Sequence, residues 1–117
     1  MPYTIEETKT YQHSIDKVFI ACQGAVEGLE GKIVESDPKE GVIEVRFHKT
    51  IHGKVLGDRT HMFVKVLEKS PDESELKIEI FPTDAVGRKL QFGARKGVAR
   101  TVLNWYFAHV EHRLKTE

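Results

Sequence analysis

The sequence has only one cysteine, no long apolar run and no excess of either charge. A lone Cys22 excludes an intramolecular disulfide and is typical of a reducing compartment. No apolar run approaches ~20 residues, and the opening MPYTIEETKTYQ lacks the basic start and apolar stretch of a signal peptide. We therefore expect a cytoplasmic protein with no membrane partner.

The balanced charge and the lack of motifs narrow the function classes further. Eighteen Lys plus Arg against eighteen Asp plus Glu give a formal net charge of zero, which does not favour nucleic acid as a partner. The sequence contains neither a P-loop pattern nor a dinucleotide-binding fingerprint. Because no catalytic motif is present, we predict a non-enzymatic protein with no catalytic residues and no cofactor.

What the sequence does contain is a regular succession of strand and helix patterns. Its 117 residues, 39% of them hydrophobic, are enough for one core, which predicts a single domain over 1–117. Alternation of apolar and polar residues predicts five strands and a further short one. Their ranges are 3–11, 32–36, 42–48, 61–67 and 76–81, with the short strand at 89–92.

Two amphipathic helices complete the predicted order β-α-β-β-β-β-α. The first covers 15–29, with Ser14 as its N-cap and Gly28 and Gly31 at its end. The last covers 98–114, and its apolar arc, which carries the only Trp, is wider than half the circumference. We predict an α+β fold in which a curved antiparallel sheet has both helices packed on one face.

Turn chemistry sets the predicted strand pairing. The run Asp37-Pro38-Lys39-Glu40-Gly41 is typical of a tight turn between two strands. A second turn, centred on Asp72, keeps all apolar residues of its two strands on one face. It pairs Val66 with Ile78, Val64 with Ile80, Lys65 with Glu79 and Phe63 with Phe81. The register of the hairpin around His52 stays open, because pairing about Gly53 or about Lys54 and Val55 preserves the pattern equally.

Three stretches carry a resemblance to a known fold: HSIDKVF before the first helix, SDPKEGVIEVRF as a turn into a strand, and FGARKGVAR before the final helix. With them the chain resembles the TATA-binding-protein-like fold, which also underlies the helix-grip (START-like) lipid and hormone binders. It is most similar to the small uncharacterised bacterial domains of that fold. The resemblance implies an apolar ligand between the final helix and the sheet. One early helix and few strands imply a smaller cavity, and the groove-inserting phenylalanine pairs of the DNA-binding members are absent.

The sheet face turned away from the helices is the first candidate site. It carries an aromatic pair and two basic side chains that favour self-association through this face or through a sheet edge. These interface candidates are Phe63, Phe81, Arg46 and Lys65. His48 and His61 share the face, and with His52 and Asp58 nearby they are candidates for a zinc site or an acid–base pair. The alternative is a solvated face without a function.

The second candidate is the basic run before the last helix: Arg88, Lys89, Arg95, Lys96 and Arg100. From 84 to 100, five positive charges less one negative give +4. Gly93 and Gly97 leave backbone amides available at a helix start, which predicts a site for a small anion. No set of stacking aromatic residues accompanies these charges, so nucleic-acid recognition is not predicted. The alternative is a solvated loop.

The third candidate is the space between the last helix and the sheet. Trp105, Tyr106 and His109 would line it, with His109 orienting a polar group of an apolar ligand; the alternative is that these side chains are ordinary core. The leading hypothesis is a non-enzymatic binding or interaction module that forms a homo-oligomer. The alternative is a small-molecule binding protein for an apolar or anionic ligand, and a histidine-dependent metal site or enzyme comes third.

Overall fold

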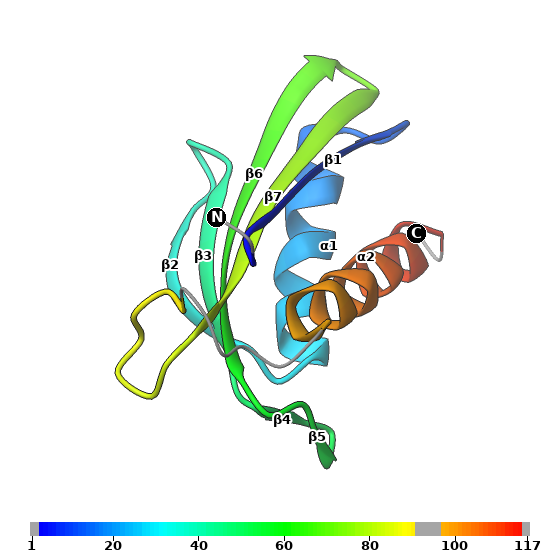
Figure 1. Ribbon diagram of the computed structural model, residues 1–117. Helices are drawn as coiled ribbons and strands as arrows, with labels where there is room; N and C mark the ends of the chain where they lie inside the picture. Colours follow the sequence, from blue (N-terminus) through cyan, green and yellow to red (C-terminus); the bar gives the residue numbers. More distant parts are fainter. Residues whose placement is uncertain (1–2, 91–96, 116–117) are drawn as a thin grey trace.

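A computed structural model describes residues 3–90 and 97–115 of the chain. Figure 1 shows two helices beside one curved sheet, with a small hairpin at the lower end of the sheet. The elements in chain order are β1 (Ile5–Tyr11), α1 (Ile15–Gly28), β2 (Lys32–Asp37), β3 (Val42–Phe47), β4 (Thr50–Ile51), β5 (Lys54–Val55), β6 (Arg59–Ser70), β7 (Glu73–Thr83) and α2 (Val98–Lys115).

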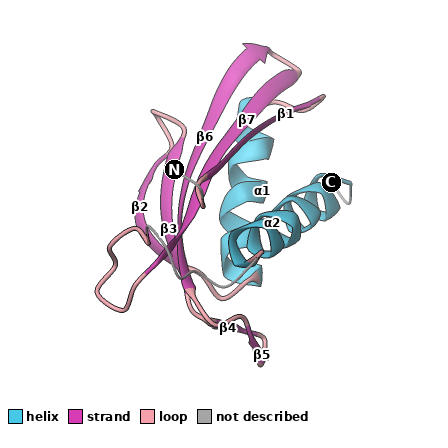
Figure 2. Ribbon diagram, viewed as in Figure 1, coloured by secondary structure: helices cyan, strands magenta, loops and turns pink. Residues whose placement is uncertain are grey.

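The main sheet has five antiparallel strands in the order β1-β7-β6-β3-β2. Both helices cover the same face of this sheet, which curves around them (Figure 2). The predicted α+β architecture, including its antiparallel sheet and one-sided helix layer, is confirmed. The predicted hairpin around His52 forms, but its tip is a separate ladder of the two-residue strands β4 and β5. These two strands were not predicted, because a two-residue strand has no period to detect.

Helix α1 begins and ends within one residue of the predicted bounds, but a glycine is not what stops it. The Ser14 side chain accepts a hydrogen bond from the Lys17 amide at 3.4 Å, as an N-cap does. At the other end the left-handed conformation that commonly stops a helix belongs to Glu30, with φ 60°, and not to a glycine. Gly31 is needed for space instead, since a Cβ there would lie 2.7 Å from the Phe47 ring.

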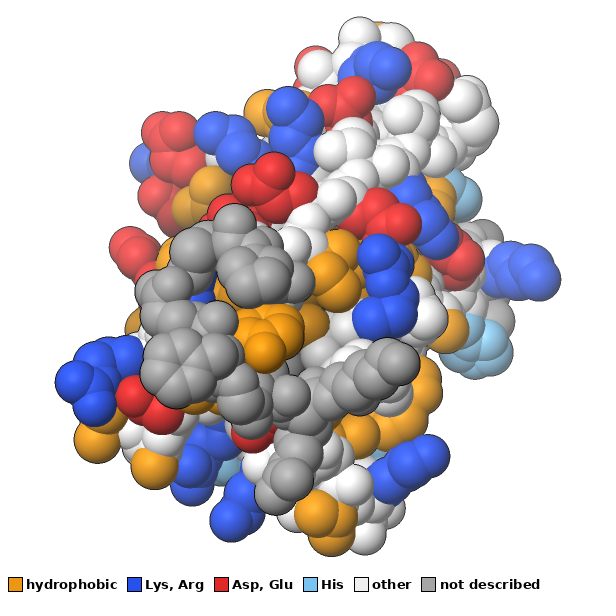
Figure 3. Space-filling model, viewed as in Figure 1, with side chains coloured by type: hydrophobic (Ala, Val, Ile, Leu, Met, Phe, Trp, Pro, Cys, Tyr) orange, Lys and Arg blue, Asp and Glu red, His pale blue; other side chains and the backbone are white. Residues whose placement is uncertain are grey.

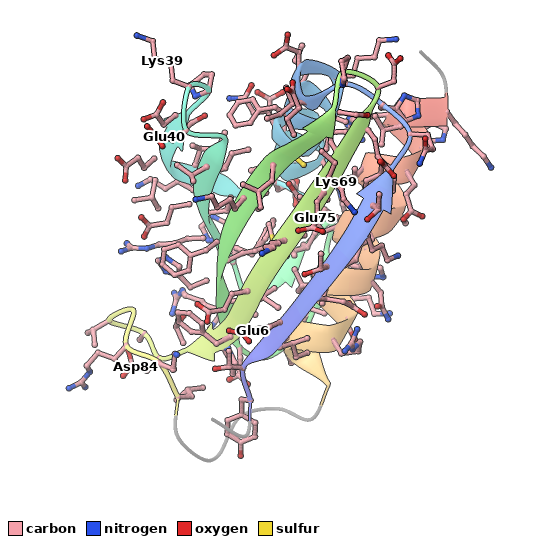
Figure 4. All side chains as sticks on the ribbon, turned by 90° about the horizontal axis from the view of Figure 1, so that it is seen from above. Glu6, Lys39, Glu40, Lys69, Glu75 and Asp84 are labelled. Carbon is pink, nitrogen blue, oxygen red and sulfur yellow. The ribbon has the colours of Figure 1, made fainter. Side chains whose placement is uncertain are left out.

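The turn between β2 and β3 forms as its sequence predicts. The Asp37 carboxylate accepts hydrogen bonds from the Lys39 and Glu40 amides, and the Gly41 amide donates to the Asp37 carbonyl at 2.8 Å. Gly41 has φ 70° and also touches β6, because a Cβ on it would lie 2.5 Å from the Val66 carbonyl oxygen. Lys39 and Glu40 point outward at the tip of this turn (Figure 4).

The predicted register between β6 and β7 is wrong by two residues. Val64 lies opposite Ile78, Lys65 opposite Lys77 and Phe63 opposite Glu79, while Phe81 lies opposite His61. The strands are joined by the two-residue loop Pro71-Asp72, and the register changes between Glu68 and Ser70. A shift of two residues returns every side chain to the same face, so the apolar pattern does not distinguish the two registers.

The core lies between the inner face of the sheet and the two helices. Apolar side chains from both layers fill it with almost no exposure, among them Val45, Met62, Leu76, Ile80, Val102, Leu103 and Val110. Tyr106 joins the helices, because its buried hydroxyl donates a hydrogen bond to the Cys22 carbonyl at 3.0 Å. Burial raises the pKa of the Cys22 thiol to about 12, so this side chain is an unreactive part of the core.

Candidate functional site

The space directly between α2 and the sheet is filled by side chains. Val102, Met62, Val64 and Ile78 are buried there with almost no exposure. Tyr106 was predicted to line a ligand site, but its side chain is fully buried and hydrogen-bonded to α1. Tyr106 is therefore a core residue and not a ligand-binding one.

An open groove of about 420 Å³ remains at the edge of this core. It lies between α2, the end of α1 and the β4–β5 hairpin, which Figure 1 shows below the helices. Its lining combines two buried aliphatic side chains with aromatic, imidazole and cationic groups, namely Leu29, Ile51, His52, Lys54, Trp105, Ala108 and His109. Such a mixture of apolar surface and few polar groups is typical of small-molecule sites, and the volume is within their usual range.

The β4–β5 hairpin forms one wall of the groove, and His52 fixes its position. His52 and Gly53 have φ values of 51° and 79°, as the two central residues of a type I′ turn require. The His52 ring donates a hydrogen bond to the Gly28 carbonyl at the end of α1, and its backbone amide donates to Glu30 at 2.7 Å. In this hairpin Thr50 lies opposite Val55, so the pairing is centred between His52 and Gly53. The pairing of β3 with β6 is centred one residue later, between Gly53 and Lys54.

His109 supplies the polar group on the helix side of the groove. Its Nδ1 lies 3.1 Å from Nη1 of Arg113, and a guanidinium can only donate, so Nδ1 is the acceptor. Burial lowers the pKa of His109, and the charge of Arg113 and the nearby His52 and His112 lower it further. The neutral ring therefore carries its proton on Nε2, where it can donate a hydrogen bond.

Trp105 and Lys54 face each other across the groove. The Lys54 Nζ atom lies 5.6 Å from the centroid of the Trp105 ring, within the range of a cation–π interaction. The indole is half-buried and packs against the core from one side. Its remaining surface offers a flat apolar contact to a ligand beside the cationic group.

The basic run before α2 does not gather into one site within the described residues. Arg88 pairs with Asp84 at 3.1 Å, the Lys89 Nζ atom lies 4.3 Å from the centroid of the Phe81 ring, and Arg100 pairs with Glu7 at 3.0 Å. Arg95 and Lys96 lie outside the described residues. The anion site at the start of α2 stays a prediction.

The outer face of the sheet carries Phe63 at its centre. Phe63 is 42% exposed, whereas Phe81 is only 8% exposed because Lys89 covers it and His61 stacks on it at a centroid distance of 5.5 Å. Arg46 and Lys65 are exposed on the same face. Around Phe63 the face has a hollow of about 550 Å³, lined by β1, β2, β3, β6 and β7. The two phenylalanines are therefore diagonal neighbours rather than a directly opposed pair.

A metal site formed by His48 and His61 would require the two residues to lie opposite each other on neighbouring strands, and they do not. Arg46 lies opposite His61, and the His61 Nε2 atom is engaged with Glu44 at 2.7 Å. Over residues 3–90 and 97–115, no group of three or more histidine, cysteine, aspartate or glutamate side chains is arranged to hold a metal ion. Nothing in this part of the chain supports the metal hypothesis.

Several groove residues were not predicted as ligand-binding from the sequence. Leu29 and Ala108 look like ordinary helix residues, and Ile51 and Lys54 were placed in a connecting loop. The contact of this loop with α2 is a tertiary one, which periodicity does not report. The one usable signal is the dipeptide His52-Gly53, because His adopts a positive φ more readily than most residues and Gly adopts it freely, as a two-residue type I′ hairpin turn requires.

Comparison with known proteins identifies the fold but no family. No family model matches the chain, and no curated protein matches its sequence. Among solved structures, a START superfamily protein from Mycobacterium smegmatis matches with a TM-score of 0.62 at 8% identity, covering 97% of this chain and 98% of its own. Ara h 8.0201 matches with a TM-score of 0.60 at 15% identity, covering 97% of this chain and 98% of its own.

A third similar structure is BexL, a di-domain ARO/CYC protein of the BE-7585A biosynthetic pathway. It matches with a TM-score of 0.60 at 10% identity and covers 96% of this chain, which spans only 46% of the BexL chain. Identities this low show a shared fold alone. The chain thus has the helix-grip, START-like fold. In the described part of the chain, neither helix has the length and apolar character needed to cross a membrane.

Proposed function

We propose that the protein binds a small, flat, largely apolar molecule in the groove between α2 and the β4–β5 hairpin. The observation that carries this proposal is the lining of the groove, which combines Trp105 and His109 with the buried side chains of Leu29 and Ile51. Solved structures of similar fold include a START superfamily protein and an ARO/CYC protein, which fits a ligand-binding role.

The groove chemistry restricts the ligand class. Its apolar floor and the Trp105 face favour an aromatic or alicyclic body, and the His109 Nε2–H favours a hydrogen-bond acceptor such as a carbonyl or phenolic oxygen. Lys54 at the rim adds a preference for negative over positive charge. The groove is open to solvent along one side, so we expect modest affinity and recognition of a class of molecules.

The single tryptophan makes a direct test available, since Trp105 lines the groove. We expect the apolar anionic fluorophore 1-anilinonaphthalene-8-sulfonate to bind the folded protein and to quench Trp105 emission by energy transfer. Ala108→Phe fills the groove from an exposed position of α2 and should weaken binding at least about tenfold.

The matched control is His112→Phe, which adds an aromatic ring at another exposed position of α2 outside the groove. We expect it to retain wild-type binding, with circular dichroism showing that both variants are folded. Equal binding by both variants, or no quenching in the wild type, would contradict the groove as the site. Native mass spectrometry of freshly purified protein would then report any molecule retained elsewhere.

A second candidate function is self-association through the outer sheet face, favoured by the exposure of Phe63 inside a hollow. Two neighbouring rows of side chains cross this face: Glu79 and Glu44 flank Phe63 in one, and Lys77 lies beside Lys65 in the other. A two-fold axis between the rows would place each glutamate row against the lysine row of a second copy. The proposed dimer is therefore complementary in charge, and the Phe63 ring of each copy contacts the Lys65 side chain of the other.

A further inference from the structure

A second, smaller hollow of about 200 Å³ lies where β3 ends and β6 begins, on the side of the loop that follows β7. Cationic side chains from three neighbouring strands line it: Lys32 on β2, Arg46 on β3 and Arg59 on β6. Two histidines, His48 and His61, complete the basic side, and no aspartate or glutamate is among the described lining residues. We propose that this basic hollow binds the phosphoryl group of a small molecule.

Strand register brings these charges together. Lys32 lies directly opposite Arg46, and Arg46 lies directly opposite His61. Arg59 is two residues before His61 on the same strand, so the two side chains share a face. Direct neighbours across a sheet are about 5 Å apart, which lets several of these side chains reach one anion. The sequence does not reveal this group, because its three cations are far apart along the chain.

The cations of the hollow are not neutralised by their neighbours. Within residues 3–90 and 97–115, neither Lys32, Arg46 nor Arg59 forms an ion pair. Glu44, two residues from Arg46 on the same face, is engaged with His61 at 2.7 Å. Like charges held close together without a counter-charge raise the electrostatic potential in the hollow, and a dianion relieves it more than a monoanion does.

The loop after β7 forms one side of the hollow. Ala85, Val86 and Gly87 line the hollow, and Asp84 organises the loop from its base (Figure 4). The Asp84 carboxylate accepts hydrogen bonds from the Arg88 and Val86 amides, and those from Arg88 contribute most to lowering its pKa. This negative group is therefore occupied by its own loop.

The test is a titration of the ¹⁵N-labelled protein with inorganic phosphate, followed by backbone amide shifts at constant ionic strength. We expect the largest shifts at residues 85–87 and at Arg46 and Arg59. Acetate, with one charge, should bind at least about tenfold more weakly. Arg46→Gln should weaken phosphate binding about tenfold, since a hydrogen bond to a charged group is lost.

Lys65→Gln is the matched control, because it removes one charge from the same sheet face outside the hollow. We expect it to bind phosphate within about twofold of the wild type, and Arg59→Gln serves where Arg46→Gln does not fold. Equal losses in Lys65→Gln and Arg46→Gln, equal affinity for acetate, or shifts centred on the start of α2 would overturn the proposal. Ala108→Phe should leave phosphate binding intact, so failure of the hollow and failure of the groove are distinguishable.

Discussion

His109 is the residue on which the electrostatics of the groove depend. Its ring and the Arg113 guanidinium both lie against Gly28 of α1, where an added Cβ would be 2.8 Å from His109 Nδ1. Because Gly28 has no side chain, α1 and α2 approach closely here, and this approach keeps the His109 ring partly buried and neutral. A histidine on an apolar helix arc is visible in the sequence, but the neighbour that sets its protonation comes from another helix.

The protonation of His109 predicts a pH dependence of stability. The pKa of His109 in the folded state lies below the ordinary value of 6.5. At a pH between the folded-state pKa and 6.5, the unfolded chain therefore binds more protons than the folded chain does. Stability should therefore fall as the pH drops below about 6.5, with a contribution on the order of 1 kcal/mol or less, given partial exposure. Urea denaturation at pH 7.5 and 5.5 measures it.

His109→Gln should lose less stability than the wild type between these two pH values. His48→Gln, which removes an exposed histidine that does not contribute to the lowered pKa of His109, should lose as much as the wild type. The same dependence in all three proteins would show that protonation of His109 is not disfavoured by folding.

At the scale of elements, turns and close approaches decide the details of the sheet. The turn from Asp37 to Gly41 was predictable because Asp37, Pro38 and Gly41 are each favoured at their positions for a local reason. The β6–β7 register was not, because two registers two residues apart bury the same side chains and only the loop at Pro71-Asp72 distinguishes them. The partners of Lys89 and Arg100 were equally unpredictable, since Arg100 pairs with the distant Glu7 and Lys89 reaches the Phe81 ring only because the loop after β7 folds back.

Two glycines with similar backbone angles separate the cost of a turn conformation from the cost of a close approach. Gly53 has φ 79° with nothing within 4 Å of an added Cβ, so Gly53→Ala should cost about 1–2 kcal/mol from the backbone angle alone. At Gly41 the added carbon would also lie 2.5 Å from the Val66 carbonyl oxygen. Gly41→Ala should cost about 3 kcal/mol or more in a urea titration, because β3 and β6 would have to separate.

Both substitutions replace Gly by Ala in the same protein, so their effects on the free energy of the unfolded state cancel in the comparison. Equal destabilisation by Gly41→Ala and Gly53→Ala would mean that the turn does not press against β6 in solution.

At the scale of the molecule, the layers of the fold followed from the sequence more readily than its sites. The apolar arc of 98–114 and the one-sided strands require helices on one face of a sheet, and that arrangement is observed. The groove and the basic hollow both depend on how the segment between β3 and β6 and the loop after β7 fold back. Positive and negative side chains are interspersed over the face seen in Figure 3, which fits the zero net charge.

The proposed self-association is tested at the same scale by Phe63→Asp. We expect native mass spectrometry to show a wild-type dimer and a monomeric variant, because the substitution removes the aromatic ring from the interface. Phe81→Asp is not used for this test, because the Phe81 side chain is buried beneath Lys89 and its loss would also change the stability of the monomer. The control is Ile20→Asp, at an exposed apolar position on α1, which should remain dimeric. A monomeric wild type, or a dimeric Phe63→Asp, would refute the interface.

The position of β1 has a consequence for how the chain folds. As the first strand in the sequence it pairs with the last, Ile5 opposite Ile80, and Lys9 and Tyr11 bond Glu111 of α2. The β6–β7 hairpin closes a two-residue loop at little entropic cost, whereas β1 must close the longest loop in the sheet. During synthesis β1 and α1 emerge before β7, and β1 has no strand to pair with until β7 exists, so this edge of the sheet is completed late.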